Sequence, residues 1–457
     1  MSDEQPWSDL MSSSADVPDQ PIVADPSRPF EPPRPTHAFP CPRRAARPAA
    51  RRAPQPCSAP TRTTATRTTA TLSTPARLAE RVFGYLPRAD QRRWAHAYLS
   101  RLLAEPSSRS AVLPQVTDAD RGLRRFINSS PWDWQPARRV LASVAAEALE
   151  ARALTVGVVR IPKRGPHSVG VGPRPVPGLG RTVNCQLAVG LFQAGPEHTV
   201  PLDWALVLDG PWATDAAARS RARIPASHTA RPLVLEVRDL VTTALDRGHG
   251  VGTPLTAELR EVPDITPLVV ELIARGQDFV IEVTPGQPLR EALTRAAVGT
   301  AAEARPLTAQ TLVQRAALRP TIARRPLARC ALPGGPATGQ VTARAVRLPL
   351  GGGEGGEPLP VLHLLSRRPV HPDEPRRFWL SSLREGSAEA QSALTGHARR
   401  TGAVLDELAQ DFGALAFEGR SYPGWHHHMT MVSAAYLYRS LAGRSAAAPA
   451  DRFEESA

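Results

Sequence analysis

The chain has 457 residues, enough for one large core or for two to three modules, and its formal net charge is +13. No apolar run is long enough to cross a bilayer, which excludes a membrane-spanning protein. The acidic start MSDEQPWSDL does not fit a secretory signal, and four scattered cysteines give no disulfide framework. These features predict a cytoplasmic protein.

Arginine supplies nearly all of the positive charge. Among 56 basic residues only Lys163 is a lysine, and the chain also holds 48 prolines. This composition is typical of a protein from a GC-rich bacterial genome, so codon bias explains part of the charge. Guanidinium groups neutralise phosphates whatever their origin, and the charge therefore still points toward a nucleic-acid partner.

The first 74 residues are dominated by Pro, Ser, Ala, Thr and Arg and contain the tandem repeat TRTTATRTTA. Such a segment lacks the apolar residues needed for a core, so we predict a disordered leader over 1–74 and a disordered tail over 444–457. Two interpretations of the leader stay open: a segment without function, or a basic arm that binds nucleic acid loosely.

Residues 75–150 are predicted to form a helical N-terminal domain. Thr74 is a suitable cap for a helix that has Pro75 in its first turn. Further on, Trp94, Tyr98 and Leu102 are spaced by four residues and should share the buried face of a second helix.

Another helix is predicted to follow the start signal SSPWDWQPARR. Its spacing places Arg138 and Arg139 on the outer face. The residues expected to face inward are Val140, Leu141, Val144 and Leu149.

From Leu154 the periodicity becomes that of strands. Three consecutive strands are predicted at LTVGVVRIP, TVNCQLAVGLF and DWALVLDG. The segments that follow alternate: a helix at RPLVLEVRDLVTTALDRG, a strand at TPLTAELREV, a helix at DITPLVVELIARG and a strand at DFVIEV. This order predicts an α/β sheet with an antiparallel edge. The glycine-rich stretches GVGPRP and GLGR lack a phosphate-loop pattern and are predicted to be turns.

A β-rich insertion is predicted over 285–375, where Pro, Gly and Arg, the loop GGGEGGE and weak strands such as QVTARAVRL break the alternation. The strand RFWLSSL then resumes the core, and helices are predicted at 388–413 and 427–442. The core is accordingly divided into a first part, 151–284, and a closing part, 376–443.

Near the end of the chain, FEGRSYPGWHHHMT contains three consecutive histidines, His426, His427 and His428. Neighbouring residues on a helix or strand point in different directions, so three adjacent imidazoles rarely converge on one metal ion. The chain also offers neither a Cys-x-x-Cys pair nor a second histidine cluster. These residues alone leave open a metal site, a catalytic site and a structural segment.

Seven stretches, taken together and in order, resemble the DDE transposases of bacterial insertion sequences, in a subgroup abundant in actinobacteria. They cover roughly residues 78–441, and the histidine segment is the last of them. The stretches are YLPRADQRRWAHAYLSRLL, SPWDWQPARR, IPKRGPHSVGV, GRTVNCQLAVGLF, PLDW, FWLSSL and FEGRSYPGWHHHMTMVSAA. The resemblance implies that FEGRSYPGWHHH is a family landmark after the last catalytic helix and not a metal site.

The resemblance also implies a fold and a chemistry. The fold is an RNase H-like mixed sheet flanked by helices, formed by 154–284 and 376–415 and interrupted by the insertion. In that fold an aspartate on the first strand, another on the fourth and a glutamate on a late helix hold two magnesium ions. Carboxylates are needed there because two divalent cations must be neutralised by hard oxygen ligands before they act on a phosphodiester.

The catalytic acids of the family are missing at the matching positions. The three family acid positions fall on Gly157, on Leu259 and on Gly402. Glu258 and Glu407 are the nearest acids, but Glu258 is expected on the opposite face of its strand and Glu407 about 140° around its helix. We also expect Arg160 to repel a divalent ion near the first strand.

Other charged residues have two interpretations each. Asp203 and Asp209 could reach an active site, but caps or turns are the ordinary role of aspartates in such segments. Lys163 and Arg164, just past the first strand, fit either a phosphate contact or a solvated surface. The residues predicted to face DNA are Lys163, Arg164, Arg399, Arg400 and Arg420.

Three functions follow from these observations. The first is a catalytically inactive, nucleoid-associated transposase relative that binds double-stranded DNA, with itself or an intact transposase as a further partner and with no cofactor. The second is an active DDE enzyme that uses magnesium and displaced acids such as Glu258 and Glu407. The third is a protein-interaction module that does not bind DNA.

Overall fold

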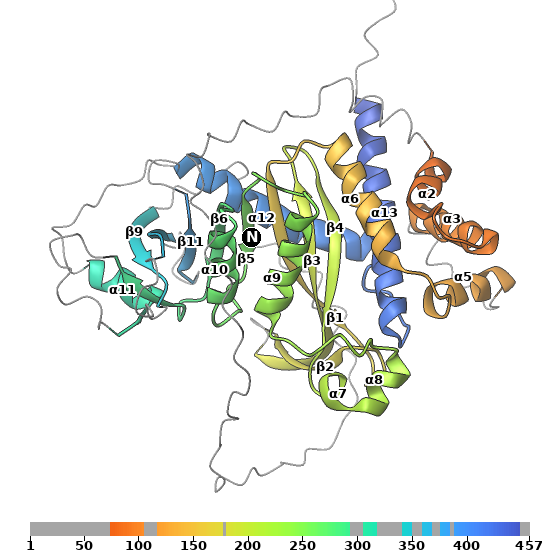
Figure 1. Ribbon diagram of the computed structural model, residues 1–457, viewed down its shortest axis with the longest axis horizontal. Helices are drawn as coiled ribbons and strands as arrows, with labels where there is room; N and C mark the ends of the chain where they lie inside the picture. The colour runs from red at the N-terminus through yellow and green to blue at the C-terminus, as the bar shows by residue number, and fades with distance from the viewer. Residues whose placement is uncertain are drawn as a thin grey trace, which may run out of the picture. The chain divides into compact units, whose positions relative to one another are not determined.

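The centre of the protein is a mixed eleven-stranded sheet (Figure 1). The structure, a computed structural model, describes residues 74–104, 117–176, 180–292, 305–317, 341–349, 359–367, 375–383 and 388–447. Of the leader predicted over 1–74 only Thr74 is described, and the GGGEGGE loop lies outside these ranges. Of the tail predicted over 444–457, residues 444–447 are described and are helical.

Five strands form the part of the sheet that was predicted from the alternation of strands and helices. Strand β3 pairs antiparallel with both β1 and β4, while β5 lies parallel to both β1 and β6. Their order across the sheet is β4-β3-β1-β5-β6. These strands are β1 (Ala153–Pro162), β3 (Arg181–Ala194), β4 (Thr199–Val207), β5 (Leu255–Glu258) and β6 (Phe279–Val283). The predicted α/β sheet with an antiparallel edge is confirmed.

Strand β11 and the strands of the insertion extend this sheet beyond β6. Strand β11, which corresponds to the predicted strand RFWLSSL, pairs antiparallel with β6, and the order continues as β11-β10-β9-β7-β8. One helix, α11 (Ala309–Ala317), accompanies them. The strands are β7 (Pro288–Glu291), β8 (Leu307–Thr308), β9 (Val341–Arg347), β10 (Leu362–Arg367) and β11 (Arg377–Ser381).

Strand β2 (Val171–Val176) corrects one prediction. The stretch GVGPRP was predicted to be a turn, but it pairs antiparallel with residues 181–186 of β3. Pro173 and Pro175 have no N–H groups to donate, and an edge strand tolerates this because only one of its sides is paired. Of the second predicted turn, GLGR, the structure describes Gly180, whose φ of 59° favours glycine, and Arg181, where β3 begins.

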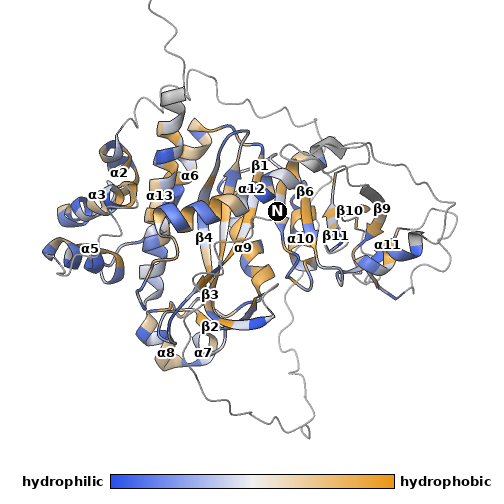
Figure 2. Cartoon of the chain, turned by 180° about the vertical axis from the view of Figure 1, so that it is seen from behind, coloured by the Kyte–Doolittle hydropathy of each residue, from blue (hydrophilic) through white to orange (hydrophobic). Residues whose placement is uncertain are grey.

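Helices cover both faces of the sheet. Helices α9 (Leu233–Asp246) and α10 (Thr266–Ala274) lie on one face, called the α9 face below, and α12 (Ala388–Phe412) crosses the other, called the α12 face (Figures 1 and 2). Helix α13 (Tyr422–Ala447) contacts both β4 and α6 (Trp134–Ala148). Two short helices, α7 (Pro211–Thr214) and α8 (Ala216–Ala222), follow β4.

The described part of 75–150 is helical, and it belongs to the same compact unit as the sheet. The Thr74 side chain accepts a hydrogen bond of 3.3 Å from the Arg77 N–H, as expected of a cap. On the second helix Leu102 is buried and Trp94 and Tyr98 are half-buried, so their shared face is confirmed. Before α6, the structure describes the helices α2 (Pro75–Phe83), α3 (Ala89–Leu103) and α5 (Asp118–Asn128).

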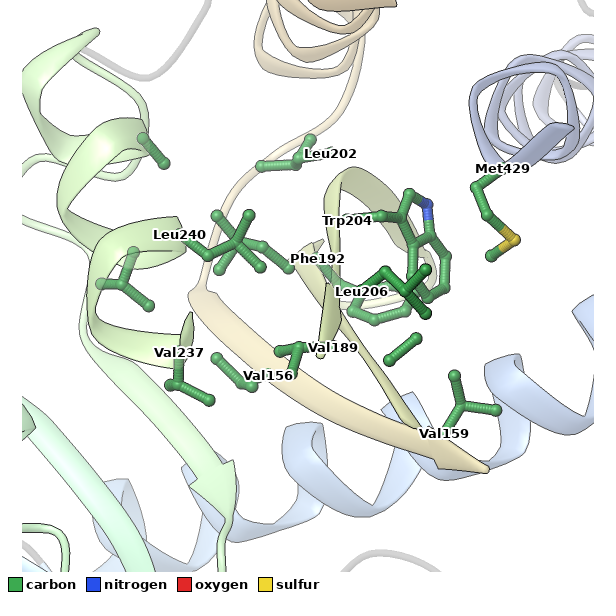
Figure 3. Packing of buried hydrophobic residues seen from close by; sticks show 14 of the residues in the cluster. Val156, Val159, Val189, Phe192, Leu202, Trp204, Leu206, Val237, Leu240 and Met429 are labelled. Atoms are coloured by element: carbon green, nitrogen blue, oxygen red, sulfur yellow. The ribbon is translucent and has the colours of Figure 1, made fainter. Parts of the chain in front are cut away.

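Buried valines on β1 show how the two faces are built. Val156 lies beside Val237 of α9, whereas Val159 is on the other side of the strand (Figure 3). Side chains alternate between the faces of a strand, and both faces of β1 are covered by helices. This explains why the strand reads as an almost continuous apolar run.

Helix α6 confirms its predicted inner face and corrects one residue of its outer face. Arg139 is exposed as predicted, but Arg138 has only 1% of its surface exposed. Of the predicted inward residues, Val140 is half-buried, and the other three are buried: Leu141, Val144 and Leu149.

The burial of Arg138 has a clear physical reason, since its guanidinium group is fully engaged. It donates to Asp203 Oδ1 at 2.6 Å, to the Trp204 carbonyl at 2.8 Å and to Thr430 Oγ1 at 2.8 Å. It also contacts His426, at 3.1 Å for both the ring Nδ1 and the carbonyl oxygen. A buried charge is tolerated only with such partners, and these come from segments that helical periodicity does not reveal.

Candidate functional site

The α12 face of the sheet carries the segment in which the family acids were expected. Thr155 of β1 is the register neighbour of Thr256 on β5, and its hydroxyl lies 2.5 Å from that of Thr401 on α12. Because side chains two residues apart share a face, Gly157 and Glu258 also belong to the α12 face. Continuing the β1–β5 register by one step makes Gly157 and Glu258 neighbours.

This placement corrects the expectation for Glu258. Leu259, on which the family count falls, is buried and lies on the α9 face, because it is two residues beyond Ala257, the register neighbour of Val156. Glu258 therefore lies on the α12 face, on which an acid of the site is required.

A second acid, Glu282, extends this row and was missed from the sequence. It is the register neighbour of Glu258 on β6, and its side chain is 1% exposed against 33% for Glu258. The missed signal was a carboxylate inside the otherwise apolar strand FVIEV, since a buried acid requires a partner.

The partner is Arg377, the first residue of β11. Its Nε donates to Glu282 Oε1 at 2.7 Å, and its Nη2 donates to Glu282 Oε2 at 2.6 Å and to Glu258 Oε1 at 2.9 Å. Burial acts to lower the pKa of Arg377, but the hydrogen bonds and charges of the two glutamates outweigh it, so the pKa is raised. The two acids thus share one cation.

At the first acid position neighbouring side chains crowd the place that a side chain would take. A Cβ built on Gly157 would lie 2.8 Å from Leu405 Cδ1, 3.1 Å from Thr401 Cγ2 and 3.3 Å from Phe192 Cε2. All three neighbours present carbon atoms. The strand and helix are in direct apolar contact where the family positions its leading aspartate.

The third acid position, Gly402, is exposed, and a Cβ there would meet nothing within 4 Å. Glu407, the nearest glutamate on α12, is directed toward α13 and not toward the sheet. Its carboxylate accepts from Tyr436 Oη at 2.8 Å and forms an ion pair with Arg439. The structure therefore does not bring Glu407 to Glu258.

Arg160 does not face the site either. It is three residues from Gly157 on β1, so it belongs to the opposite face, and it forms an ion pair with Glu261. The expected repulsion of a metal ion by Arg160 therefore has no geometric basis. The cation that does reach the α12 face near Glu258 is Arg377.

The two aspartates weighed as site residues are held in ion pairs elsewhere. Asp203 lies within β4 and not in a turn, and it pairs with Arg138. Asp209 follows the end of β4 and pairs with Arg174 at 2.5 Å.

The three histidines of α13 point to three different environments. His426 stacks on Trp134 with ring centroids 4.5 Å apart, and His427 stacks on Trp132 at 3.9 Å. The His428 ring lies 2.9 Å from Tyr98 Oη and 3.0 Å from the Gly413 carbonyl. Burial lowers the pKa of His428 to about 4. The three rings therefore have different main partners, as the divergence of adjacent residues predicts.

The basic residues predicted to face DNA divide into two groups. Lys163 donates to the backbone carbonyls of Leu415 and Phe417, and burial lowers its pKa to about 8. Arg400 donates to the carbonyls of Gly195 and Pro196. The exposed group consists of Arg164, Arg399 and Arg420.

The described ranges contain no group of three or more His, Cys, Asp or Glu side chains arranged to hold a metal ion. They also contain no helix that is both long enough and apolar enough to span a membrane.

A family model described as DDE superfamily endonuclease matches residues 81–330, which is more than half of the chain. No curated protein matches the chain. The match includes the first five of the seven stretches quoted above, and the mixed sheet flanked by helices agrees with it, so the RNase H-like fold is confirmed. The chain belongs to the family of DDE superfamily endonucleases.

Proposed function

We propose that this protein is a transposase-like DNA-binding protein of an insertion-sequence family that does not cleave DNA. The observation that carries the proposal is the state of the three family acid positions. One is a glycine packed under Leu405, one is an exposed glycine, and the third has Glu258 beside it, paired with Arg377.

The two magnesium ions that the family implies do not fit these residues. A two-metal site needs carboxylates that bridge and surround both ions, and hard divalent cations need several oxygen ligands each. Here Glu258 and Glu282 share the α12 face with the guanidinium group of Arg377, which already forms an ion pair with each of them. No step of phosphodiester cleavage is therefore assigned to this chain.

For DNA, the exposed arginines are the support. Arg164 and Arg420 lie in segments that Lys163 holds together, since its ammonium group donates to the Phe417 carbonyl. Arg399 is exposed on α12. We assign phosphate contacts to these three arginines, and we assign to Lys163 and Arg400 the task of fixing the segments that carry them.

The test of DNA binding is retention on duplex DNA as a function of salt. Affinity should fall steeply with rising salt, and the double variant R164A/R420A should reduce the salt slope by about one for each lost contact. The variant R275A removes one positive charge at the end of α10 on the α9 face, and it shows how much the slope changes when a charge is lost away from the proposed surface. An unchanged slope in the double variant would place the DNA surface elsewhere.

The test of inactivity uses supercoiled plasmid and the end sequences of the element. With magnesium or manganese, we expect binding without nicking or strand transfer. The competing function is an active enzyme with displaced acids, which the shared face of Glu258 and Glu282 favours. Cleavage that disappears in E258Q would establish that function and refute ours. A protein without salt-dependent retention would instead be an interaction module.

A further inference from the structure

Arg377 is held on the α12 face by more than one kind of contact. Its guanidinium group binds both oxygens of Glu282 and one oxygen of Glu258. The same group lies 5.3 Å from the ring centroid of Trp379, two residues further along β11. Two parallel hydrogen bonds to one carboxylate fix the orientation of the guanidinium plane, and the aromatic ring adds a cation–π contact.

The strand pairing makes this arrangement a built-in part of the sheet. Glu258 and Glu282 are brought together by the parallel pairing of β5 with β6, and Arg377 follows from the antiparallel pairing of β11 with β6. The Arg377 side chain is 22% exposed, and the Glu282 side chain is only 1% exposed. Exposed ion pairs contribute little to stability, but a carboxylate as buried as Glu282 would be strongly destabilising without a cation.

We infer that Arg377 is the permanent counter-ion of the Glu258–Glu282 pair, so that a side chain of this chain occupies the place of a divalent cation. The position agrees with this role, because the pair follows Gly157 across β1, β5 and β6 on the α12 face. Arg377 thus balances the charge of the two glutamates where the family would use a metal ion. The inference does not depend on the proposed DNA binding, since it stands on the contacts of Arg377 alone.

The charge balance of the cluster predicts how it responds to metal ions. Two carboxylates and one guanidinium leave one net negative charge in the cluster, and Glu258 is the more exposed of the two acids. With Arg377 in place, a divalent ion would meet a cation bound to three of the four carboxylate oxygens. Without Arg377, the same two carboxylates would offer hard oxygen ligands and two negative charges to such an ion.

The experiment compares the full-length protein with R377M in metal-free buffer and with added Mn²⁺. The methionine keeps much of the aliphatic volume and removes the charge. We expect no Mn²⁺ effect on the native protein, a lower thermal midpoint for R377M, and recovery of about 2 °C or more in R377M when Mn²⁺ is added. Electron paramagnetic resonance should detect Mn²⁺ bound to R377M only.

Two controls separate charge from packing. R377K retains a cation, so its midpoint should not respond to Mn²⁺. E258Q/R377M leaves a single carboxylate and should lose the Mn²⁺ response of R377M. A folded R377M that neither loses stability nor binds Mn²⁺ would overturn the inference, as would a native protein that binds Mn²⁺ at Glu258.

If R377M does not fold, the neutral variant E258Q/E282Q/R377M decides the question. The inference expects this variant to fold and to ignore Mn²⁺, because no charge remains to be balanced. An unfolded neutral variant would show that Arg377 acts through packing and would overturn the inference. Both readouts are independent of DNA, so a failure here is distinguishable from a failure of the proposed function.

Discussion

Leu405 of α12 lies directly over Gly157 of β1, with 2.8 Å between its Cδ1 and the place of a Cβ on the glycine. Gly157 is the position on which the leading acid of the family falls, and a leucine side chain covers it. The helix and the strand are also joined by the hydrogen bond between the hydroxyl groups of Thr155 and Thr401.

Restoring the first acid should therefore be costly. We expect G157D to lower the free energy of unfolding by about 3 kcal/mol or more, because the carboxylate would be buried among carbon atoms without a cation. Chemical denaturation measures this loss. The double variant G157D/L405A should lose less than the sum of the single variants, since the shorter side chain makes room. Strictly additive losses would show that Leu405 is not the obstacle.

The third position should behave in the opposite way. Gly402 lies inside α12 with open space around its Cβ position. We expect G402A to raise the free energy of unfolding by about 0.5–1 kcal/mol, because alanine has the higher helix propensity. G402E should be tolerated equally, as measured by the denaturation midpoint. A clear loss of stability in G402E would mean that another group occupies this space.

Arg138 should be the most sensitive arginine of α6. Its replacement in R138M leaves Asp203 without its main cation, and we expect a loss of about 3–5 kcal/mol in the free energy of unfolding. The neighbouring exposed residue supplies the control, since R139A should change stability by no more than about 0.5 kcal/mol. R138M/D203N should recover part of the loss. Equal effects of R138M and R139A would contradict the structure.

His428 should make the protein sensitive to mild acid. Its folded-state pKa of about 4 lies below the value of about 6.5 in an unfolded chain, because burial disfavours the imidazolium. The unfolded state therefore binds more protons between these values, and stability that is complete above pH 6.5 falls as the pH drops toward 4. The slope for one such group is at most about 1.4 kcal/mol per pH unit.

The variant H428Q isolates this contribution, because glutamine retains a donor and an acceptor but does not titrate. The free energy of unfolding should be compared for both proteins at pH 7, 6 and 5. We expect the curve of H428Q to be flatter below pH 6.5. Parallel curves would show that His428 does not titrate on unfolding.

Periodicity predicted the elements whose partners lie on one face, and it failed where the partner is distant in the chain. The alternation of β3 and the spacing of α3 were sufficient for correct predictions. Arg138 and Glu282 were not recognised as buried charges, because their partners Asp203 and Arg377 are separated from them by long stretches of chain. Helical periodicity predicts an exposed Arg138, and only the fold shows that Asp203 lies where it can pair with a buried Arg138.

The site shows the same division. Counting residues from the family motifs located Gly157 and Gly402 on the strand and helix expected of them. The count at Leu259 was one residue away from Glu258, and only the β1–β5 register shows which of the two side chains lies on the face of the site.

Helix α13 begins at Tyr422 and not at 427 as predicted, because Pro423 is acceptable in a first turn.

The pairing of β11 with β6 has a consequence for the synthesis of the protein. During translation β6 is complete long before β11, and until residues 377–381 emerge its outer edge has no partner strand. Over the same interval Glu282 has no cation. A nascent or truncated chain that ends within the insertion should therefore expose an unpaired, aggregation-prone strand edge and a carboxylate without a counter-ion. We expect such a chain to depend on chaperones until Arg377 has been synthesised.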